Sequence, residues 1–346
     1  MTDAVLALGG QRYSGWTALR MTRGIMQIAG GYELTVTERF DGLTAPRPIK
    51  PGQVASVALG SQTVIQGYVD VVAPDYDKVN HTLTVSGRDA TGDLVDCAAI
   101  HKSGSWSNRT MAQIAADLCA PFKVPVKVLT SVGAPFAHWS IEPGETVMEN
   151  LDRMARYRGV LLMSDGVGSL LITQPGQYQA PAALVLGENI EKARGHSSLQ
   201  ERFSEYIVKA QQMGDDALFG SNAASPSGNA LDTAVGRYRP TVILAEDQAN
   251  VSGCKLRAAW QRTVIAAKAQ SIVYTVNGWM AKGKLWQPNA LVPVRDAFMG
   301  INETRLISQV DFYLDEGGER TELTVTGRHA FDPIKVPQPN PHGGLF

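Results

Sequence analysis

Apolar and polar positions alternate in short runs along the first ninety residues, and Gly and Pro separate the runs. A period of two is typical of strands with one buried face, and the Gly and Pro residues indicate turns. Regular short strands of this kind favour a small barrel or sandwich. The expected strands are residues 17–22, 32–40, 54–59, 64–72 and 82–87.

Near Cys97 the apolar residues become spaced by three and four positions, which predicts helices. Asn108 is expected to cap the first helix, which ends at Pro121. A second helix follows Pro143-Gly144, and Gly159 stands where a left-handed residue ends a helix. The predicted apolar faces are Met111, Ile114, Ala115 and Leu118 in the first helix and Val147, Leu151, Met154 and Ala155 in the second.

Three short strands accompany these helices. Residues 160–163 and 170–173 are expected to pair across the Gly-containing segment between them. Residues 124–128 predict an edge strand, because Pro125 lacks the N–H that a central strand donates. Residues 97–186 are therefore predicted to form a compact α+β module.

Strand patterns return from Gly187 onward, beginning with an expected strand at 205–211. Residues 214–236 are rich in Ser, Asn, Ala and Gly and predict a mobile loop. Ser252 is expected to cap a helix that runs to Ala269. The other expected strands are residues 272–276, 291–294, 305–312 and 321–327, followed by an extended Pro- and Gly-rich tail at 333–346.

A sequence repeat links the two ends of the chain. The octapeptide 83–90 (LTVSGRDA) recurs as 323–330 (LTVTGRHA), with six of eight residues identical and an offset of 240. Val69-Asp70 precedes the first copy and Val310-Asp311 precedes the second at a similar distance. We interpret this as two related β domains around an insert, although chance reuse of a common strand sequence remains an alternative. An offset this long is not a solenoid period.

The predicted fold class is therefore mainly β with an α+β insert. Two related small β-barrel domains flank the α+β module. The predicted divisions are a first barrel at 1–96, the α+β domain at 97–186, a second barrel at 187–332 that contains the mobile loop 214–236, and the tail at 333–346.

Composition narrows the class of protein. The formal net charge is −1, which disfavours nucleic-acid binding through a basic surface. The three widely spaced cysteines disfavour a disulfide scaffold. No apolar run is long enough for a transmembrane helix, and the N-terminal segment lacks the basic start of a signal peptide. Charged residues make up only 19% of the chain, against about 25% in typical domains, which suggests that other subunits cover part of its surface.

Candidate chemistry is sparse. No local metal-ligand cluster, nucleophile motif or phosphate-binding loop stands in the sequence. Glu142 and Glu145 could form a glycosidase acid–base pair, but acids also favour the start of the helix that follows them. Asp75, Asp77 and Asn80 are better explained by turn chemistry than by a cation loop. We therefore predict a non-enzymatic protein with no catalytic, cofactor-binding or metal-binding residues.

Short segments along nearly the whole chain resemble the baseplate hub proteins of Mu-like contractile-tailed phages, also described as P-type tail proteins. None of the segments is catalytic, so the resemblance lies in their combination and order. They are Pro51-Gly52, residues 67–70 (GYVD), 85–89 (VSGRD), 93–97 (DLVDC), 143–146 (PGET), 155–162 (ARYRGVLL), 238–240 (YRP) and 276–279 (VNGW), and Leu285-Trp286.

This resemblance implies a homotrimer similar to the base of type VI secretion spike proteins. Each subunit would give two similar β-barrels, so that the trimer forms a pseudo-sixfold ring between a hexameric tail tube and a trimeric central spike. The implied partners also include other baseplate proteins, and DNA would pass through the lumen without specific binding. No cofactor is implied. The implied location is the virion tail baseplate of a phage or prophage, reached after assembly in the host cytoplasm.

Two other functions remain open on the sequence. A tail-associated protein that binds host-surface carbohydrate or degrades the cell wall would need a cleft with paired carboxylates, for which Glu142 and Glu145 are the local candidates. A protein that binds nucleic acid in a channel would need a basic lumen, which the net charge neither shows nor excludes.

Overall fold

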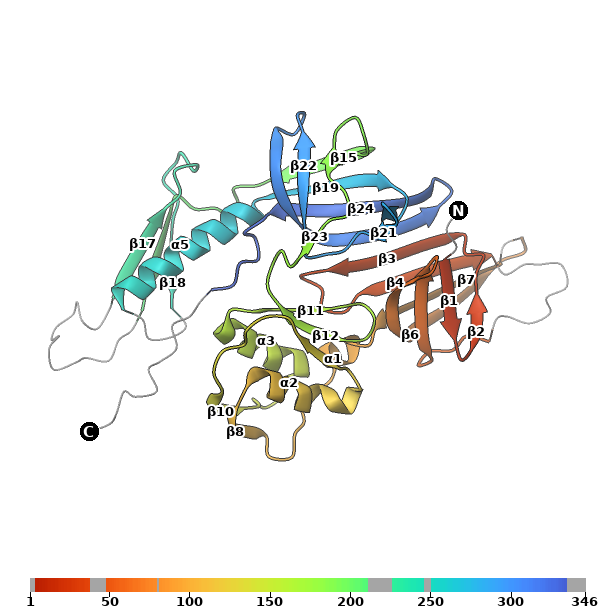
Figure 1. Cartoon of the computed structure of the whole chain (residues 1–346), viewed down its shortest axis with the longest axis horizontal. Helices are drawn as coiled ribbons and strands as arrows, with labels where there is room; N and C mark the ends of the chain where they lie inside the picture. Colours follow the sequence, from red (N-terminus) through yellow and green to blue (C-terminus); the bar gives the residue numbers. More distant parts are fainter. Residues whose placement is uncertain (1–3, 38–47, 80, 211–225, 246–249, 335–346) are drawn as a thin grey trace.

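The computed structural model describes residues 4–37, 48–79, 81–210, 226–245 and 250–334. A sheet of fourteen strands crosses the molecule, with the α+β module on one side of it and a small helix-containing unit at one end (Figure 1). The main path of the sheet runs in the order β15 (Lys192–Ser197), β19 (Gln270–Asn277), β24 (Gly318–Gly327), β23 (Ile301–Asp315), β3 (Ala18–Gly24), β4 (Gly31–Thr37), β7 (His81–Asp89), β6 (Gln62–Tyr76), β5 (Val54–Leu59), β1 (Ala4–Leu8) and β2 (Gln11–Tyr13). A branch joins β22 (Ala290–Asp296) to β23, and β13 (Tyr178–Gln179) and β14 (Leu184–Val185) to β22.

The N-terminal and C-terminal parts of the chain meet inside this sheet, where β3 pairs antiparallel with the second half of β23. At this junction the hydroxyl of Thr22 donates a hydrogen bond of 2.6 Å to Asp311 Oδ1. The mainly β fold class is confirmed. The pairing does not show the two expected β-barrel domains as closed barrels: within the described ranges the strands of both halves form one continuous sheet.

The sequence repeat corresponds to a structural repeat. Strand β7 lies between β4 and β6, and strand β24 lies between β19 and β23 in the same antiparallel arrangement. Val69-Asp70 and Val310-Asp311 are not equivalent, however, because Val69 stands opposite Gly87 whereas Val310 stands opposite Leu323. Strand register instead matches Val310 with Pro74, so the resemblance of the two Val-Asp pairs is coincidental.

One hydrophobic core supports both halves of the sheet. Leu34 and Val85 from the first half and Phe312 and Val325 from the second are almost completely buried in the same cluster. Burial alternates along β4 and β7, as expected for strands with one buried side, whereas β23 has runs of consecutive buried residues.

The α+β module has its own core beneath the sheet in Figure 1. Helix α3 is confirmed with its predicted apolar face, and Gly159 ends it with φ 59°. The cap of α2 is Thr110 rather than Asn108, because Thr110 and Gln113 exchange side-chain-to-backbone hydrogen bonds as a capping box. The module comprises α1 (Gly92–Asp96), β8 (Ser105–Arg109), α2 (Met111–Cys119), η1 (Ala120–Phe122), β9 (Val126–Val128), β10 (Phe136–Ser140), α3 (Val147–Arg158), β11 (Leu161–Ser164) and β12 (Leu170–Thr173).

The strand pairing of the module agrees with the sequence. Strands β11 and β12 form the predicted antiparallel pair. Strand β9 pairs in parallel with β12 and lies at the edge of the three-stranded sheet, as Pro125 predicted.

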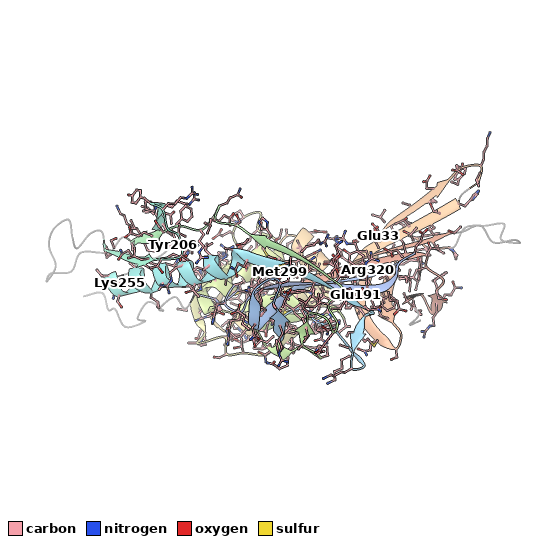
Figure 2. All side chains as sticks on the ribbon, turned by 90° about the horizontal axis from the view of Figure 1, so that it is seen from above. Glu33, Glu191, Tyr206, Lys255, Met299 and Arg320 are labelled. Carbon is pink, nitrogen blue, oxygen red and sulfur yellow. The ribbon has the colours of Figure 1, made fainter. Side chains whose placement is uncertain are left out.

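A third core lies at the far end of the molecule, between α5 (Val251–Lys268) and the sheet of β16 (Glu205–Lys209), β17 (Ser227–Leu231) and β18 (Pro240–Leu244). Figure 2 shows Tyr206 of this sheet beside the helix that carries Lys255, far from Glu33 of β4. A short hairpin of β20 (Met280–Ala281) and β21 (Lys284–Leu285) completes the strands.

Two expectations for this unit need correction. The loop predicted at 214–236 does not reach residue 236, because residues 227–231 pair with β16 and Arg202 holds Asp232 at 2.6 Å. The remainder of that loop up to residue 225, and the tail from 335 onward, lie outside the described residues. Helix α5 is capped by Asn250, whose side chain accepts the Gly253 N–H, and not by Ser252.

Candidate assembly surface

Strand β15 leaves one edge of the large sheet open. Among the described residues it pairs only with β19. Four of its six residues have polar side chains, and every residue of the strand except Ala193 is exposed. Lys192, Arg194 and His196 give this edge a basic character. An exposed strand edge presents backbone N–H and C=O groups that another strand can pair with.

The β6–β7 hairpin provides a second open edge. Strand β5 covers β6 only as far as Tyr68, and beyond Val69 the described residues of β6 pair with β7 alone. The end of the hairpin projects from the body of the molecule (Figure 2). Tyr76 is 77% exposed, and Val71 and Val79 are also largely exposed. Exposed apolar side chains beside a free strand edge are typical of a surface that another chain covers.

The acidic residues of this hairpin do not form a cation loop among the described residues. Asp77 accepts the Val79 N–H at 2.6 Å, which is the turn chemistry that the sequence predicted. Asn80 lies outside the described residues.

Arg88, from the repeated segment, has a local structural role. Its guanidinium donates to Asp70 at 2.9 Å and to Asp96 at 2.7 Å. The arginine therefore ties β7 to β6 and to helix α1, where the module begins.

Glu142 and Glu145 are held in a structural arrangement rather than an acid–base pair. Glu145 is buried and accepts hydrogen bonds from Arg153 Nε at 2.9 Å, Arg153 Nη2 at 3.0 Å, Asn150 at 2.7 Å and the Glu142 N–H at 3.0 Å. Burial opposes ionisation, but these hydrogen bonds outweigh it and lower the pKa of Glu145. A carboxylate held ionised in this way is a poor general acid.

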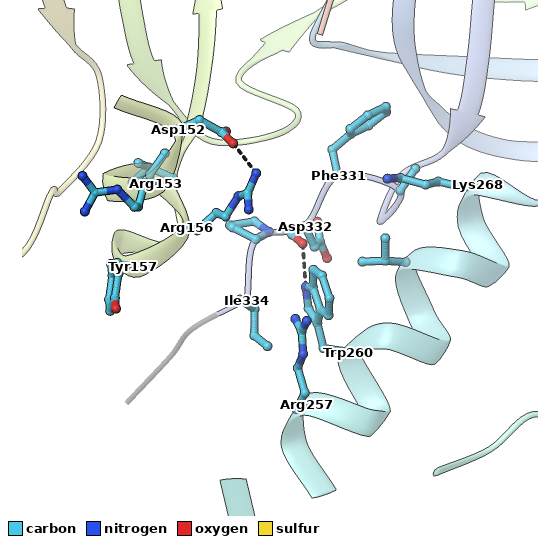
Figure 3. A pocket seen from close by; sticks show the side chains of 15 residues that line it. Asp152, Arg153, Arg156, Tyr157, Arg257, Trp260, Lys268, Phe331, Asp332 and Ile334 are labelled. Carbon is cyan, nitrogen blue, oxygen red and sulfur yellow. Dashed lines mark hydrogen bonds and ion pairs between the residues drawn. The ribbon is translucent and has the colours of Figure 1, made fainter. Parts of the chain in front are cut away.

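A pocket lies between helices α3 and α5 and the segment that follows β24 (Figure 3). The Trp260 indole donates to the Asp332 carbonyl at 2.6 Å, and Arg156 bonds Asp152 at 2.6 Å. Arg257 lies over the Trp260 ring, and Lys268 lies over the Phe331 ring. Arg156, Arg257 and Lys268 are thus engaged by a carboxylate and two rings of the pocket itself.

Sites of other kinds are not found within the described part of the chain. No group of three or more His, Cys, Asp or Glu residues there is arranged to hold a metal ion. No described helix combines the length and apolar character that crossing a bilayer requires.

Comparison with known proteins identifies the family of this chain. Family models match residues 3–89 (Mu phage baseplate assembly protein GpP-like, N-terminal), 91–174 (baseplate hub protein gp44-like, second domain) and 251–334 (Mu phage baseplate assembly protein GpP, fourth domain). The baseplate hub protein gp44 of Escherichia phage Mu is 35% identical over 351 aligned positions, which cover 98% of this chain and 92% of that protein. The chain belongs to the Mu-like baseplate hub family.

Solved structures agree with this membership. The 43 kDa tail protein of prophage MuSo2 from Shewanella oneidensis is 39% identical, with a TM-score of 0.87 over 96% of this chain and 100% of that one. The E. coli c3393 protein, a component of the type VI secretion system, shares the fold at 11% identity, with a TM-score of 0.59 over 96% of this chain and 80% of that one.

The prediction of a Mu-like baseplate hub protein is therefore confirmed, and the chain is a structural component of a phage-type tail. Sequence reasoning missed both strand edges that lack a described partner. Strand β15 carries no alternating apolar pattern, and the expected strand over 64–72 stopped short of the exposed end of β6 at Tyr76.

Proposed function

We propose that this hub protein acts as a homotrimer that joins the hexameric tail tube to the trimeric central spike. The observation that carries the proposal is the structural repeat, in which β4, β7 and β6 have the same arrangement as β19, β24 and β23. A partner with six identical subunits needs six near-equivalent surfaces, and a chain with two copies of one unit supplies them as a trimer.

The proposed parts follow the sequence divisions. Residues 1–96 and 187–332 contribute the two ring units. Residues 97–186 form the α+β domain between them, apart from β13 and β14, which pair with β22 of the large sheet. Neighbouring subunits would close the sheet into the pseudo-sixfold ring, since open strand edges stand at both of its units. The tube, the spike and other baseplate proteins are the proposed partners, and DNA passes through the lumen without specific binding. The working location is the virion tail, and the role is non-enzymatic.

Molar mass in solution tests this proposal. Light scattering after size-exclusion chromatography should give about 112 kDa, three times the chain mass of 37.2 kDa. Electron microscopy of the same fraction should show rings with threefold or apparent sixfold symmetry. A strict monomer at micromolar concentration would contradict the proposal.

A further inference from the structure

We propose that the end of β15 of one subunit pairs antiparallel with the edge of β6 that no described strand covers in the next subunit, with Ser198 opposite Asp75. This inference rests on the proposed homotrimer and specifies the strands and register that join its subunits. The template is the β3–β23 pairing, which spans Leu19–Gly24 and Gln309–Leu314. We call the corresponding contact, residues 195–200 of one subunit against residues 73–78 of the next, the seam.

The repeat provides the register of the seam. Strand β24 corresponds to β7 with the offset of 240, so the partners of each strand also correspond. Thr82 lies 240 residues before Glu322, so these two residues are counterparts. Asp311 stands opposite Glu322 and Asp75 stands opposite Thr82, which makes Asp75 the counterpart of Asp311.

The same mapping identifies the counterpart of Thr22. Thr22 of β3 pairs with Gly31, which stands opposite Arg88. In the second half, the Ser198 N–H donates to the Ala269 carbonyl at 2.9 Å, one residue beyond the pairing of Ser197 with Gln270. Since Ser271 stands opposite Thr326, continuing this register places Ala269 opposite Arg328 and makes Ser198 the counterpart of Thr22.

The junction inside the chain shows what these counterparts do. Thr22 and Asp311 face one another across the β3–β23 pairing, and the threonine hydroxyl bonds the carboxylate at 2.6 Å. Ser198 and Asp75 keep the two chemical groups, a hydroxyl and a carboxylate. A seam with the same geometry would therefore reproduce this hydrogen bond between subunits.

The residue of β6 that corresponds to Phe312 of β23 is much more exposed than Phe312, as expected if a second subunit covers it. Phe312, which β3 covers inside the chain, is 1% exposed, whereas its counterpart Tyr76 on the free edge is 77% exposed. Both are aromatic. An added strand would cover one flank of the tyrosine, as β3 covers one flank of the phenylalanine.

Charge and backbone also fit a second copy of this chain. The proposed register places His196 opposite Asp77 of the hairpin, whereas Arg194 is bonded to Glu322 of its own chain at 2.9 Å. Pro74 has no N–H, so the seam can hold one hydrogen bond fewer than an unbroken edge. Because the two edges are different and lie on one chain, copies join head to tail and can close into a ring.

Disulfide cross-linking tests the seam. In a Cys97→Ser background, which removes the exposed thiol, the matched pairs are Ser198→Cys with Asp75→Cys and Ser197→Cys with Tyr76→Cys. Directly opposite residues in antiparallel strands have Cα atoms about 4.5–5.5 Å apart, which suits a disulfide. Under mild oxidation, both matched pairs should give covalent dimers and trimers that a reducing agent removes.

The control combines Ser198→Cys with Tyr76→Cys. This pair is shifted by one residue, which places the thiols on opposite faces of the sheet, so we expect about tenfold less cross-linking. Light scattering on the same samples separates the two proposals. A trimer in which matched pairs cross-link no better than the shifted pair would overturn the seam alone. A protein that stays monomeric would overturn the trimer and the seam together.

Discussion

Replacing Glu145 with Gln should destabilise the α+β module without changing its shape. The carboxylate accepts four hydrogen bonds, two of them from the Arg153 guanidinium. A glutamine side chain keeps one acceptor oxygen and turns the other into an NH2 group. In the better orientation the amide nitrogen faces Arg153 Nε, because the other oxygen position serves three donors.

The cost follows from these contacts. One charge-assisted hydrogen bond of 2.9 Å is lost, and Arg153 keeps only Glu142 as a counter-charge, at 3.6 Å. Hydrogen bonds to charged groups contribute about 1.5–3 kcal/mol, so we expect a loss of about 2 kcal/mol in the stability of the module. The matched control is Glu142→Gln, which should cost less than about 0.5 kcal/mol because this side chain is 66% exposed.

Amide hydrogen exchange measured by mass spectrometry reports this local stability. In peptides covering α3, a loss of about 2 kcal/mol corresponds to exchange roughly 30-fold faster. Unchanged exchange in Glu145→Gln, or equal effects of both substitutions, would refute the reasoning. A cell-wall-degrading activity that disappears with Glu145→Gln would instead restore the acid–base interpretation.

The same carboxylate predicts a pH dependence. Burial disfavours the charged form, but the bonds from Arg153, Glu142 N–H and Asn150 leave the pKa of folded Glu145 below its ordinary value. Its stabilisation is therefore complete above the unfolded-state pKa of about 4.3 and is lost as the pH falls through the folded-state pKa. Glu145→Gln should therefore make the protection of α3 amides against exchange less dependent on pH over this acidic range.

Three further predictions concern other parts of the chain. Gly87→Ala should lower the free energy of unfolding by about 3 kcal/mol or more, because a Cβ there would lie against the Tyr68 carbonyl and 2.6 Å from Tyr32 Oη. In thermal melts the control Gly31→Ala, whose Cβ would have its nearest contact at 3.8 Å, should be far milder. Asp232→Asn should destabilise the unit around α5 by about 2 kcal/mol in urea titrations, because Arg202 bonds this carboxylate at 2.6 and 3.0 Å and lowers its pKa; equal stability of both proteins at pH 7 would contradict this. Cys97 alone should react with a thiol reagent in the native protein, because burial raises the pKa of Cys254 and raises that of Cys119 to about 12; a second reactive thiol before unfolding would disprove this.

Local signals predicted the module well. The apolar face of α3 and its end at Gly159 follow from spacing and from one residue's backbone freedom, which do not depend on distant contacts. The start of α2 was harder, because Asn108 and Thr110 are both good capping residues. The reciprocal bond from Gln113 favours Thr110, and a capping box is visible in the sequence as the spacing Thr-x-x-Gln.

The assembly surface was hard to predict because its strands lack partners within the chain. Residues 192–197 have no apolar face, since β15 covers little of the core. Pro74 suggested that β6 ends early, yet the strand continues to Tyr76 because proline is tolerated where one edge is free. The signal that could have found the edge of β6 is the offset of 240, projected from the β23–β24 pair onto the β6–β7 pair.

Pro74 also bears on what happens before assembly. Before assembly, the end of β6 has one edge that no described strand covers, with Val71 and Tyr76 exposed on it. Such edges pair indiscriminately and seed aggregates at high concentration. A proline and flanking acids weaken that tendency. The counterpart of Pro74 inside the chain is Val310, whose edge β3 covers within the same polypeptide. In the proposed trimer, the duplicated unit thus carries protection against premature association only on the copy that pairs with another subunit.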